Sequence, residues 1–413
     1  MPFSTLFGLE QPVRSLQNAL AHGQVAGTYL FTGPQGVGKT ALAVAFAQAA
    51  ACTSPNPLLR KEGASGVQDR SRFAGGHSEE GDEESSFILH PSSLPFDACG
   101  VCESCRRIEA GTHPEVHVIA PAGDQTQIWQ LWDRDNRPPG VVQHTLSYSP
   151  AIGRRRVYIL ERADTLNEAA ANSLLKVLEE PPPYALFILL SPHPARMLET
   201  ILSRCQLVRL APGPVAELAA WLERTQGIEP ERARTLAAYA EGRTGTALRL
   251  TRNPAVEAEI AKLVELAEWI AGGSPIRALK AGESIRKFAS GMKALADTSD
   301  EAATAGVGSP DEGEAAPKER VGRRQLGIAL DMLATVYRDL AALSMGGPNA
   351  PVVHAGRRDS LAAVARSRPA ECWVAGIESL LLARRRVDQN ASIPLLTDWL
   401  AMRLTVAKPT GLQ

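Results

Sequence analysis

Residues 28–52 read TYLFTGPQGVGKTALAVAFAQAAAC, a run that passes from apolar residues through a glycine-rich segment to an alanine-rich one. The apolar run at 28–32 predicts a buried strand, and the alanine-rich run from residue 40 onward predicts a helix. Between them, GPQGVGKT at 33–40 matches the pattern G-x-x-x-x-G-K-[ST] in full. A strand that ends in a glycine-rich loop and continues as a helix is the layout of a phosphate-binding loop. The stretch therefore predicts an α/β domain that binds the phosphates of a nucleotide.

The residues of the loop suit this chemistry. Gly33, Gly36 and Gly38 let backbone N–H groups turn inward around phosphate oxygens, and the following helix adds the partial positive charge of its first turn. Lys39 is expected to contact the outer phosphates, and the hydroxyl of Thr40 is expected to bind Mg²⁺. ATP or ADP with Mg²⁺ is therefore the predicted ligand. A glycine-rich turn that meets no nucleotide is the alternative, and it is disfavoured by the strand and helix that flank the loop.

Hydrolysis of ATP requires a second strand that ends in acidic residues. Such a strand is predicted within RRRVYILERAD at 154–164, where Glu161 takes the metal-binding position. The next residue, Arg162, is a cation at the position where an acid that orients the attacking water is expected. Asp164 is interpreted as a capping residue of the following helix. The sequence therefore predicts a site that is weakened for catalysis.

Four cysteines predict a metal site. Three have the spacing C-x₂-C-x₂-C, and the fourth ends the helix that follows the phosphate loop. If residues 54–96 loop out as an insert, the four thiolates come together and can hold a structural Zn²⁺ in a closed tetrahedral site. An iron–sulfur cluster and unliganded cysteines are the alternatives, but the bacterial iron–sulfur pattern continues x₃-C-P, and Glu109 stands at that position. The predicted ligands are Cys52, Cys99, Cys102 and Cys105.

Short apolar runs alternate with helical patterns over residues 1–210, which predicts a mostly parallel sheet with helices on both faces. After residue 210 the strand signals stop, and the patterns are helical. Residues 54–96 and 297–320 are rich in Gly, Ser and charged residues and lack a period, so they are predicted to be disordered inserts. The expected strands are Thr28–Thr32, Val116–Ala120, Val157–Glu161, Leu186–Ser191 and Leu207–Leu210.

The composition is ordinary for a globular protein of two or three domains: 413 residues, 44% hydrophobic, with a formal net charge of -1. The near-neutral charge argues against a protein that coats DNA by itself. No apolar run approaches the roughly 18 residues of a membrane span, and the N-terminus lacks the layout of a signal peptide. Cysteines spaced as metal ligands suit a reducing compartment. A cytoplasmic location is therefore expected.

LSRC at 202–205 places Arg204 at the end of a short predicted helix, directly before the last strand. A cation at the C-terminal end of a helix is favourable in itself. A second interpretation is an arginine finger, which completes a neighbouring subunit's active site by stabilising charge on the phosphate being transferred. The residues alone leave both interpretations open.

Several segments together resemble the bacterial clamp-loader AAA+ proteins of DNA polymerase III. The resemblance covers most of residues 1–250 and, more weakly, the helical C-terminal third. It implies a RecA-like AAA+ domain with a zinc module at 1–210, a small helical lid at 211–272 and an all-α collar domain at 273–413. Besides the phosphate loop and the four cysteines, the matching segments are LFGLEQPVRSLQNAL (6–20), GTHPEVHVI (111–119), NEAAANSLLKVLEEPP (167–182), LLSPHPARMLETILSRC (189–205) and EGRTGTALRL (241–250).

The resemblance also implies roles for single residues. In this family the arginine of the SRC motif acts in trans on the ATP of the adjacent subunit, which assigns that catalytic role to Arg204. The family includes gamma/tau ATPase motors and delta-prime subunits, which contribute the finger but do not turn over ATP. Arg162 replaces an acid of the motors, and Gly245 stands where the motors carry a lid arginine, so both departures favour the non-motor branch. The complete phosphate loop, by contrast, departs from the delta-prime pattern and favours the motor branch.

The implied function is that of a non-motor subunit of the replicative sliding-clamp loader, within the DNA polymerase III holoenzyme and itself a weak or inactive ATPase. Its expected partners are the delta and gamma/tau subunits, and it is expected to reach the sliding clamp and primed DNA through the assembled complex. The alternative is an ATP-hydrolysing gamma/tau motor of the same loader. An unrelated P-loop enzyme, such as a nucleotide kinase or a helicase, is disfavoured by the lid and collar layout.

Overall fold

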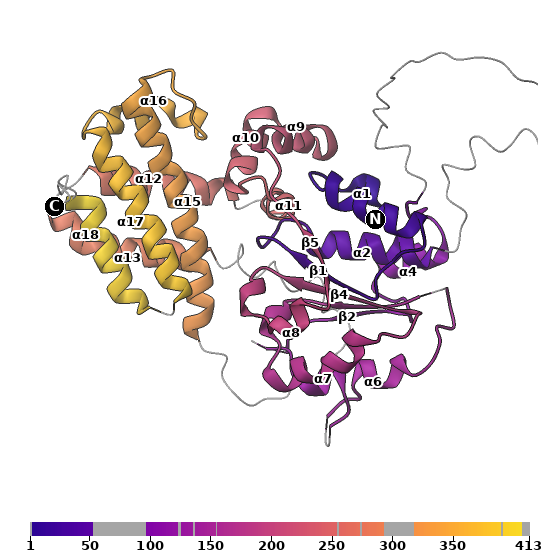
Figure 1. Cartoon of the computed structure of the whole chain (residues 1–413). Coiled ribbons are helices and arrows are strands. Elements are labelled where there is room, and N and C mark those ends of the chain that lie inside the picture. Colours follow the sequence, from indigo (N-terminus) through magenta and orange to yellow (C-terminus); the bar gives the residue numbers. More distant parts are fainter. Residues whose placement is uncertain are drawn as a thin grey trace, which may run out of the picture. The chain divides into compact units, whose positions relative to one another are not determined.

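The computed structural model describes residues 2–52, 96–122, 125–134, 137–153, 155–253, 256–272, 275–292, 318–389 and 391–406 (Figure 1). The chain divides into two compact units, Met1–Gly213 and Pro214–Gln413. The predicted inserts at 54–96 and 297–320 lie outside the described residues except for Phe96 and residues 318–320. Residues 318–320 belong to a helix, so the prediction of disorder is wrong for these three positions.

The first unit is built on a five-stranded sheet in which every strand pair is parallel. Its strand order is β2-β3-β4-β1-β5, so chain neighbours such as β1 and β2 lie apart and are joined by crossovers over the faces. The predicted parallel α/β fold is confirmed, with the strand bounds correct to within one or two residues. The strands are β1 (Thr28–Thr32), β2 (Val116–Ile119), β3 (Arg156–Leu160), β4 (Ala185–Ser191) and β5 (Gln206–Arg209).

Helices cover both faces of this sheet (Figure 1). One hydrophobic core lies under α1 and α2, where Phe46 packs edge-on against Tyr29 with ring centroids 5.2 Å apart. The other core lies under α7, which contributes the buried Leu174 and Leu178. The helical elements are η1 (Phe3–Thr5), α1 (Glu10–Ala21), α2 (Lys39–Ala51), α4 (Glu103–Glu109), α5 (Ile128–Leu131), α6 (Val141–Leu146), η3 (Ala163–Thr165), α7 (Glu168–Glu179), η4 (Pro194–Arg196) and α8 (Glu199–Leu202).

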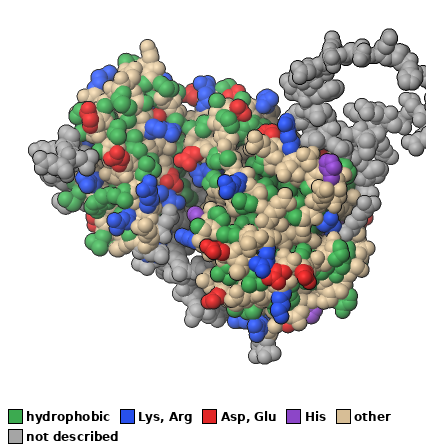
Figure 2. Space-filling model, viewed as in Figure 1, with side chains coloured by type: hydrophobic (Ala, Val, Ile, Leu, Met, Phe, Trp, Pro, Cys, Tyr) green, Lys and Arg blue, Asp and Glu red, His purple; other side chains and the backbone are tan. Residues whose placement is uncertain are grey.

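The described residues of the second unit are helical and contain no strand. Its elements are α9 (Val215–Gln226), α10 (Pro230–Tyr239), α11 (Thr244–Arg252), α12 (Val256–Ala271), α13 (Pro275–Gly291), α15 (Lys318–Gly346), η5 (Ala355–Arg357), α16 (Arg358–Ala365), α17 (Ala370–Asp388) and α18 (Ile393–Val406). On the face drawn in Figure 2, basic and acidic side chains are interspersed, as expected for a net charge of -1.

In the second unit, a series of buried hydrogen bonds links the end of α10 to α15 through His354. The hydroxyl of Tyr239, at the end of α10, lies 2.5 Å from Nε2 of His354, and Nδ1 of His354 lies 2.7 Å from a carboxylate oxygen of Asp339 in α15. The side chains of His354 and Asp339 are each only 3% exposed, so these bonds are shielded from water. Because residues 214–413 cluster as one unit, their division into a lid and a collar stays a prediction.

A buried ion pair fastens the edge strand β2 to its neighbour β3. Glu115 precedes β2, Arg156 begins β3, and Nε of Arg156 donates to Oε2 of Glu115 at 2.6 Å. The backbone N–H of Ala151 donates to the other carboxylate oxygen at 2.7 Å. Burial by itself raises the pKa of Glu115, but the N–H donors and the Arg156 guanidinium outweigh burial and hold this pKa below its usual value.

Replacing Glu115 by Gln is expected to lower the free energy of unfolding by about 3–5 kcal/mol, because the Arg156 charge is left buried without its partner. Since the folded-state pKa of Glu115 is lowered, its stabilisation is present above the unfolded-state pKa of about 4.3 and is lost as pH falls through the folded-state pKa. Urea unfolding at pH 7 and at decreasing pH measures both effects. Glu103→Gln is the control, because Glu103 pairs with Arg107 on an exposed helix surface; equal losses in the two variants would contradict the prediction.

Candidate phosphate-loop site and cysteine cluster

The predicted phosphate loop joins β1 to α2 at the carboxyl edge of the sheet. Gly36 and Gly38 have φ angles of 81° and 108°, in the region that favours glycine. Gly38 is the N-cap of α2 and has no side chain, so the first N–H groups of the helix face the loop without a side-chain cap. A helix start of this kind attracts anions. The strand, loop and helix predicted from the sequence are therefore all present.

Gly33 is required by close packing as well as by its φ of 147°. A Cβ atom at this position would lie 2.3 Å from the carbonyl oxygen of Leu210, which follows β5. The backbone of Leu210 cannot move aside easily, because its N–H donates to the carbonyl of Thr32 at 2.7 Å. The phosphate loop is thus held against the edge strand β5 by a contact that only glycine allows.

Lys39 folds back over the loop that precedes it. Its Nζ donates to the carbonyl oxygens of Gly33 and Pro34 at 2.8 and 3.0 Å. Burial lowers the pKa of Lys39 to about 8, although the nearby negative charge of Asp164 opposes this change. At neutral pH the side chain therefore stays mostly charged and can meet a phosphate.

Thr40 and Glu161 come together as the sequence predicts for a metal-bound nucleotide. The hydroxyl of Thr40, at the start of α2, donates to Oε1 of Glu161 at 3.4 Å. Glu161 directly follows β3, which is separated from β1 by β4 in the sheet. Hydroxyl and carboxylate oxygens are the ligands that Mg²⁺ prefers, so this pair suits the metal of a Mg-nucleotide.

The turn after Glu161 differs from the sequence interpretation. Asn167, and not Asp164, caps α7, because its side chain accepts the N–H of Ala170 at 2.8 Å. Asp164 instead accepts a hydrogen bond from Ser191, the last residue of β4, at 3.3 Å. The interpretation of Asp164 as a capping residue is therefore wrong, and its charge lies close enough to act on Lys39.

Ser191 was not predicted as a site residue, although the sequence marks its position. ALFILLS at 185–191 is an apolar run that ends in a polar residue, and the Ser191 side chain is fully buried at the edge where the phosphate loop lies. Arg162 has a left-handed backbone with a φ of 48°, which is uncommon for a residue with a Cβ. It therefore stands in a tight turn at the position where a water-orienting acid was expected.

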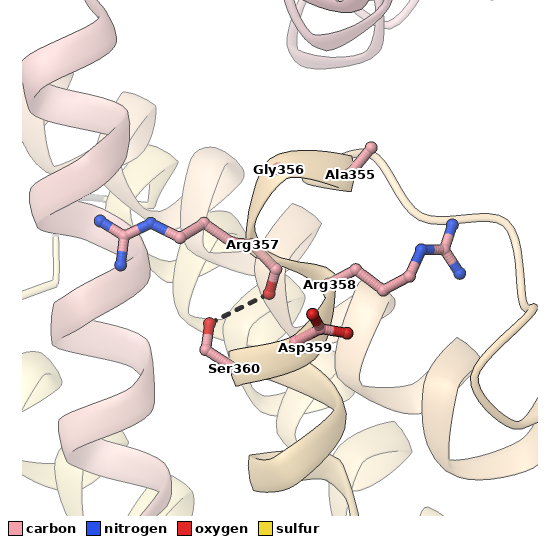
Figure 3. Close-up of a pocket in the computed structure, with 6 residues that line it drawn as sticks. All are labelled: Ala355, Gly356, Arg357, Arg358, Asp359 and Ser360. Carbon is pink, nitrogen blue, oxygen red and sulfur yellow. Dashed lines mark hydrogen bonds between the residues drawn. The ribbon is translucent and has the colours of Figure 1, made fainter.

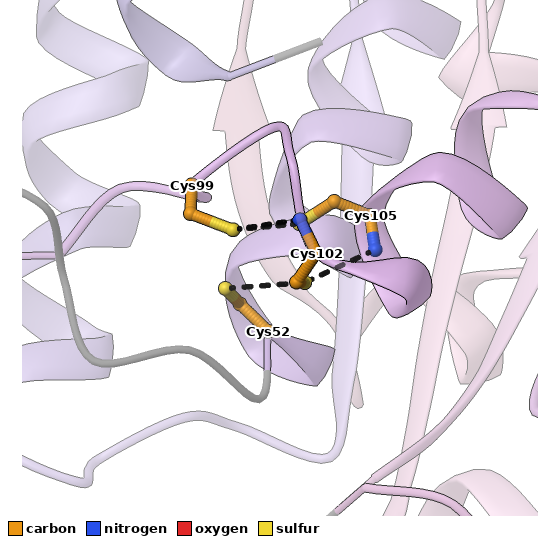
Figure 4. Close-up of side chains that lie close together, drawn as sticks. All are labelled: Cys52, Cys99, Cys102 and Cys105. Carbon is orange, nitrogen blue, oxygen red and sulfur yellow. Dashed lines mark hydrogen bonds between the residues drawn. The ribbon is translucent and has the colours of Figure 1, made fainter.

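The four predicted metal ligands converge across the gap in the described chain (Figure 4). Their sulfur atoms all lie within 4.8 Å of one another, and the Cys52–Cys102 and Cys99–Cys105 sulfur pairs are each 3.9 Å apart. Zinc–sulfur bonds of about 2.3 Å in a tetrahedron place sulfur atoms about 3.8 Å apart, so the cluster fits a tetrahedral metal. Backbone N–H groups of Cys102 and Cys105 donate to the sulfurs of Cys99 and Cys102, at 3.3 and 3.4 Å.

Polar side chains join this cluster to α2, the helix that begins at the phosphate loop. Gln48 donates to the carbonyl of Cys105 at 2.9 Å, and Ser104 donates to the carbonyl of Ala51 at 3.1 Å. His113 accepts the N–H of Glu115 on Nδ1, so its Nε2 carries the proton and donates to Ser104 at 2.9 Å. These bonds were not predicted, because nothing in the spacing of the cysteines identifies them.

Arg204 lies at the end of the sheet where the strands begin, whereas the phosphate loop lies at the end where they finish. It comes two residues before β5, and β5 begins at Gln206 opposite Tyr29 of β1. The phosphate loop begins after Thr32, so the strand register separates the two sites by about six residues, or roughly 20 Å. The Arg204 side chain is 32% exposed and forms an ion pair with Glu179, the last residue of α7. The structure thus does not bring Arg204 together with Lys39, Thr40 and Glu161.

Gly245, which stands where the motors carry a lid arginine, lies in the second unit. Gly245 is the second residue of α11, and Arg243 is its N-cap. Nε of Arg243 donates to the carbonyl of Ala240 at 2.9 Å, and its Nη2 lies 3.4 Å from Glu241. Arg243 is therefore engaged with its own turn.

A pocket beside η5 does not compete with the phosphate loop as a site. It has a volume of about 410 Å³ and is lined by residues 355–360. The side chains of Arg357 and Arg358 point in opposite directions there (Figure 3). Without converging charge, the pocket offers no anion site comparable to the start of α2.

A parallel sheet with a glycine-rich loop after β1 and an acid after β3 defines a P-loop α/β protein. Comparison with known sequences narrows this class. The sequence pattern of the family "DNA polymerase III, delta subunit" matches residues 8–69 and 85–214. The chain is 30% identical to DNA polymerase III subunit tau of Escherichia coli over 60% of this chain and 32% of that protein. It is 34% identical to subunit delta' of Pseudomonas aeruginosa over 59% and 60%, and 29% identical to subunit delta' of Bacillus subtilis over 62% and 63%.

The chain therefore belongs to the clamp-loader AAA+ family of bacterial DNA polymerase III subunits. The aligned part spans between 32% and 63% of the length of these relatives. A solved structure of a gamma subunit-related protein from Thermotoga maritima aligns over 69% of this chain and 88% of that one at 18% identity; its TM-score of 0.30 is too low to bear on the fold. Within the described residues, no helix combines the length and the apolar character that crossing a membrane requires.

Replacing Gly33 by Ala is expected to destabilise the first unit by about 1–3 kcal/mol more than Gly23→Ala, because only the first change drives a Cβ into a backbone oxygen. Gly23 is a matched control, since it also has a positive φ but has nothing within 4 Å of an added Cβ. Chemical denaturation of the two variants measures the difference. Equal losses of stability would show that the contact with Leu210 does not constrain the loop.

Proposed function

We propose that the protein is a non-motor subunit of the sliding-clamp loader of bacterial DNA replication. It assembles with delta and gamma/tau subunits and supplies Arg204 in trans to the ATP site of a neighbouring subunit. The location of Arg204 at the sheet edge opposite its own phosphate loop carries this proposal. Family membership supports the assembly, because the matched relatives are subunits of DNA polymerase III.

An arginine at this edge can only serve a phosphate that is not its own. By the strand register, Arg204 precedes β5 at the end of the sheet roughly 20 Å along the strands from the start of the phosphate loop, several times the reach of a hydrogen bond. An exposed guanidinium fixed on a rigid turn suits the stabilisation of charge on a phosphate brought by another chain. A merely favourable cation at a helix end needs neither the exposure nor the ion pair with Glu179.

The protein's own loop is proposed to bind ATP or ADP with Mg²⁺ and to hydrolyse ATP poorly. Gly33, Gly36 and Gly38 cradle the phosphates, while Lys39 and Thr40 contact phosphate and metal. Glu161 completes the metal site. Poor hydrolysis follows from Arg162, because a cation in a tight turn cannot accept the proton of an attacking water.

A gamma/tau-type motor is the second candidate function. The observation that favours it is the intact pairing of Thr40 with Glu161, together with Asp164, whose carboxylate is close enough to Lys39 to act on its charge. In a motor, Asp164 would have to take the role of the acid that Arg162 replaces.

One reconstituted loader, made from the full chain with its delta and gamma/tau partners, tests both candidates. In the presence of clamp and primed DNA, Arg204→Ala is expected to leave assembly intact and to reduce ATPase activity at the site it serves by about 10³-fold or more. Lys39→Ala is expected to leave the ATPase rate close to that of the wild type. Loss of activity in Lys39→Ala with none in Arg204→Ala would support the motor and overturn the trans role.

The cysteine cluster is proposed to hold one structural Zn²⁺. Cys52, Cys99, Cys102 and Cys105 supply four sulfur ligands and leave no open position for a substrate, as in structural sites. The bonds from Gln48 and Ser104 tie the module to the end of α2, so a bound metal would stabilise that end of the helix. The proposed setting is the cytoplasm, with the clamp and primed DNA reached through the assembled complex.

The purified full chain is expected to contain about one zinc per chain by elemental analysis. Cys102→Ser is expected to lose the metal and to lower the thermal midpoint, because the module loses the bonds that close it. Cys205→Ala is the control, since Cys205 lies outside the cluster. Iron with acid-labile sulfide in place of zinc, or an unchanged metal content in Cys102→Ser, would contradict the assignment.

A further inference from the structure

We infer that Glu179 is a positioning residue for Arg204, fixing the guanidinium in the orientation in which it meets a neighbouring subunit's phosphate. This inference rests on the proposed trans role of Arg204. Glu179 touches neither nucleotide nor metal of its own chain, because it ends α7 on the side of the sheet edge where Arg204 lies.

Three groups of the same chain hold the Arg204 side chain. Nη1 donates to the carbonyl of Thr200 at 2.8 Å and to the hydroxyl of Ser203 at 3.4 Å, and Nη2 donates to Oε1 of Glu179. The contacts with Thr200 and Ser203 come from the same short turn and move with it. Glu179 is the one partner of the three from another element, 25 residues earlier in the chain, so it alone fixes Arg204 relative to the body of the unit.

Hydrogen bonds and prolines hold the backbone around both residues in place. The N–H groups of Arg204 and Cys205 donate to the carbonyls of Ile201 and Leu202, which fixes the turn between α8 and β5. Three prolines at 181–183 end α7 directly after Glu180. A Cβ on Gly27 would lie 2.2 Å from Pro181, so the end of α7 is packed against the start of β1. The carboxylate of Glu179 is thus presented from a fixed point.

The position of Glu179 is unfavourable for a carboxylate unless a cation is near. It is the last residue of α7, where the carbonyl ends of the helix carry partial negative charge. Arg204 offsets this repulsion. Exposed ion pairs add little to folding stability, and both side chains are partly exposed, at 47% and 32%. A gain in folding stability therefore does not explain why Glu179 and Arg204 are paired. The pair is explained if Glu179 orients the Arg204 guanidinium.

The pair leaves part of the guanidinium available. Among the described residues, no hydrogen bond reaches Nε of Arg204, and only one partner contacts Nη2. Nε–H and the remaining N–H of Nη2 can therefore donate to phosphate oxygens while Nη1 stays bound to the turn. The finger can act without breaking its contact with Glu179.

The experiment uses the reconstituted loader with the full-length variants Glu179→Gln, Glu179→Asp, Glu180→Gln and Arg204→Ala. In Glu179→Gln, single-turnover hydrolysis at the adjoining site is expected to slow roughly tenfold, because a small misplacement of a catalytic group is costly. KM for ATP is expected to stay unchanged, since nucleotide binding belongs to the neighbouring loop. Glu179→Asp keeps the charge and is expected to recover most of the rate.

Glu180→Gln is the matched control, because Glu180 is the exposed neighbour of Glu179 and loses the same charge. It is expected to behave as the wild type. If Arg204→Ala slows hydrolysis and Glu179→Gln does not, the positioning role is wrong and the trans role stands. If Glu179→Gln speeds hydrolysis, the ion pair restrains Arg204 and the positioning role is likewise wrong. If Arg204→Ala itself has no effect, the proposed function fails together with the inference.

Discussion

The common direction of the five strands is the constraint on which the other features depend. All strand pairs are parallel, so the sheet has one edge where strands end and another where they begin. The phosphate loop and Glu161 directly follow strand ends, Ser191 is the last residue of β4, and Arg204 precedes the start of β5. The sheet therefore separates the groups that could hold a nucleotide from the group that could act on a nucleotide held elsewhere. An antiparallel sheet of the same residues would mix them at both edges.

The cysteine cluster is connected to this sheet through a single helix. Helix α2 begins at the phosphate loop and ends at Cys52, so the two predicted ligand sites lie at its two ends. Gln48 and Ser104 bind the cluster to the last turns of α2. Binding of a structural metal contributes folding free energy to a small module. If the cluster holds the proposed metal, it would stabilise the C-terminal end of the helix whose first turn faces the loop.

The sequence was sufficient for features that depend on local patterns. The strand, loop and helix at 28–52 follow from periodicity and a complete motif, and the meeting of Cys52 with the later cysteines follows from the chemistry of thiolates. Pairs that depend on the order of strands in the sheet could not be predicted. Asp164 with Ser191 and Glu179 with Arg204 are 27 and 25 residues apart, and no period relates their positions. The cap of α7 was misplaced because Asp164 and Asn167 are both good capping residues and only the fold decides between them.

Helix α7 begins beside the turn that carries Glu161 and Asp164, and it ends at the partner of Arg204. Its 12 residues span about 18 Å. One inserted or deleted residue would turn Glu179 by about 100° around the helix axis and take its carboxylate away from the guanidinium. Substitutions on the exposed face of α7 leave that geometry intact. The length of this helix is therefore under stricter constraint than most of its side chains, and natural variation in it should consist of replacements and not of insertions or deletions.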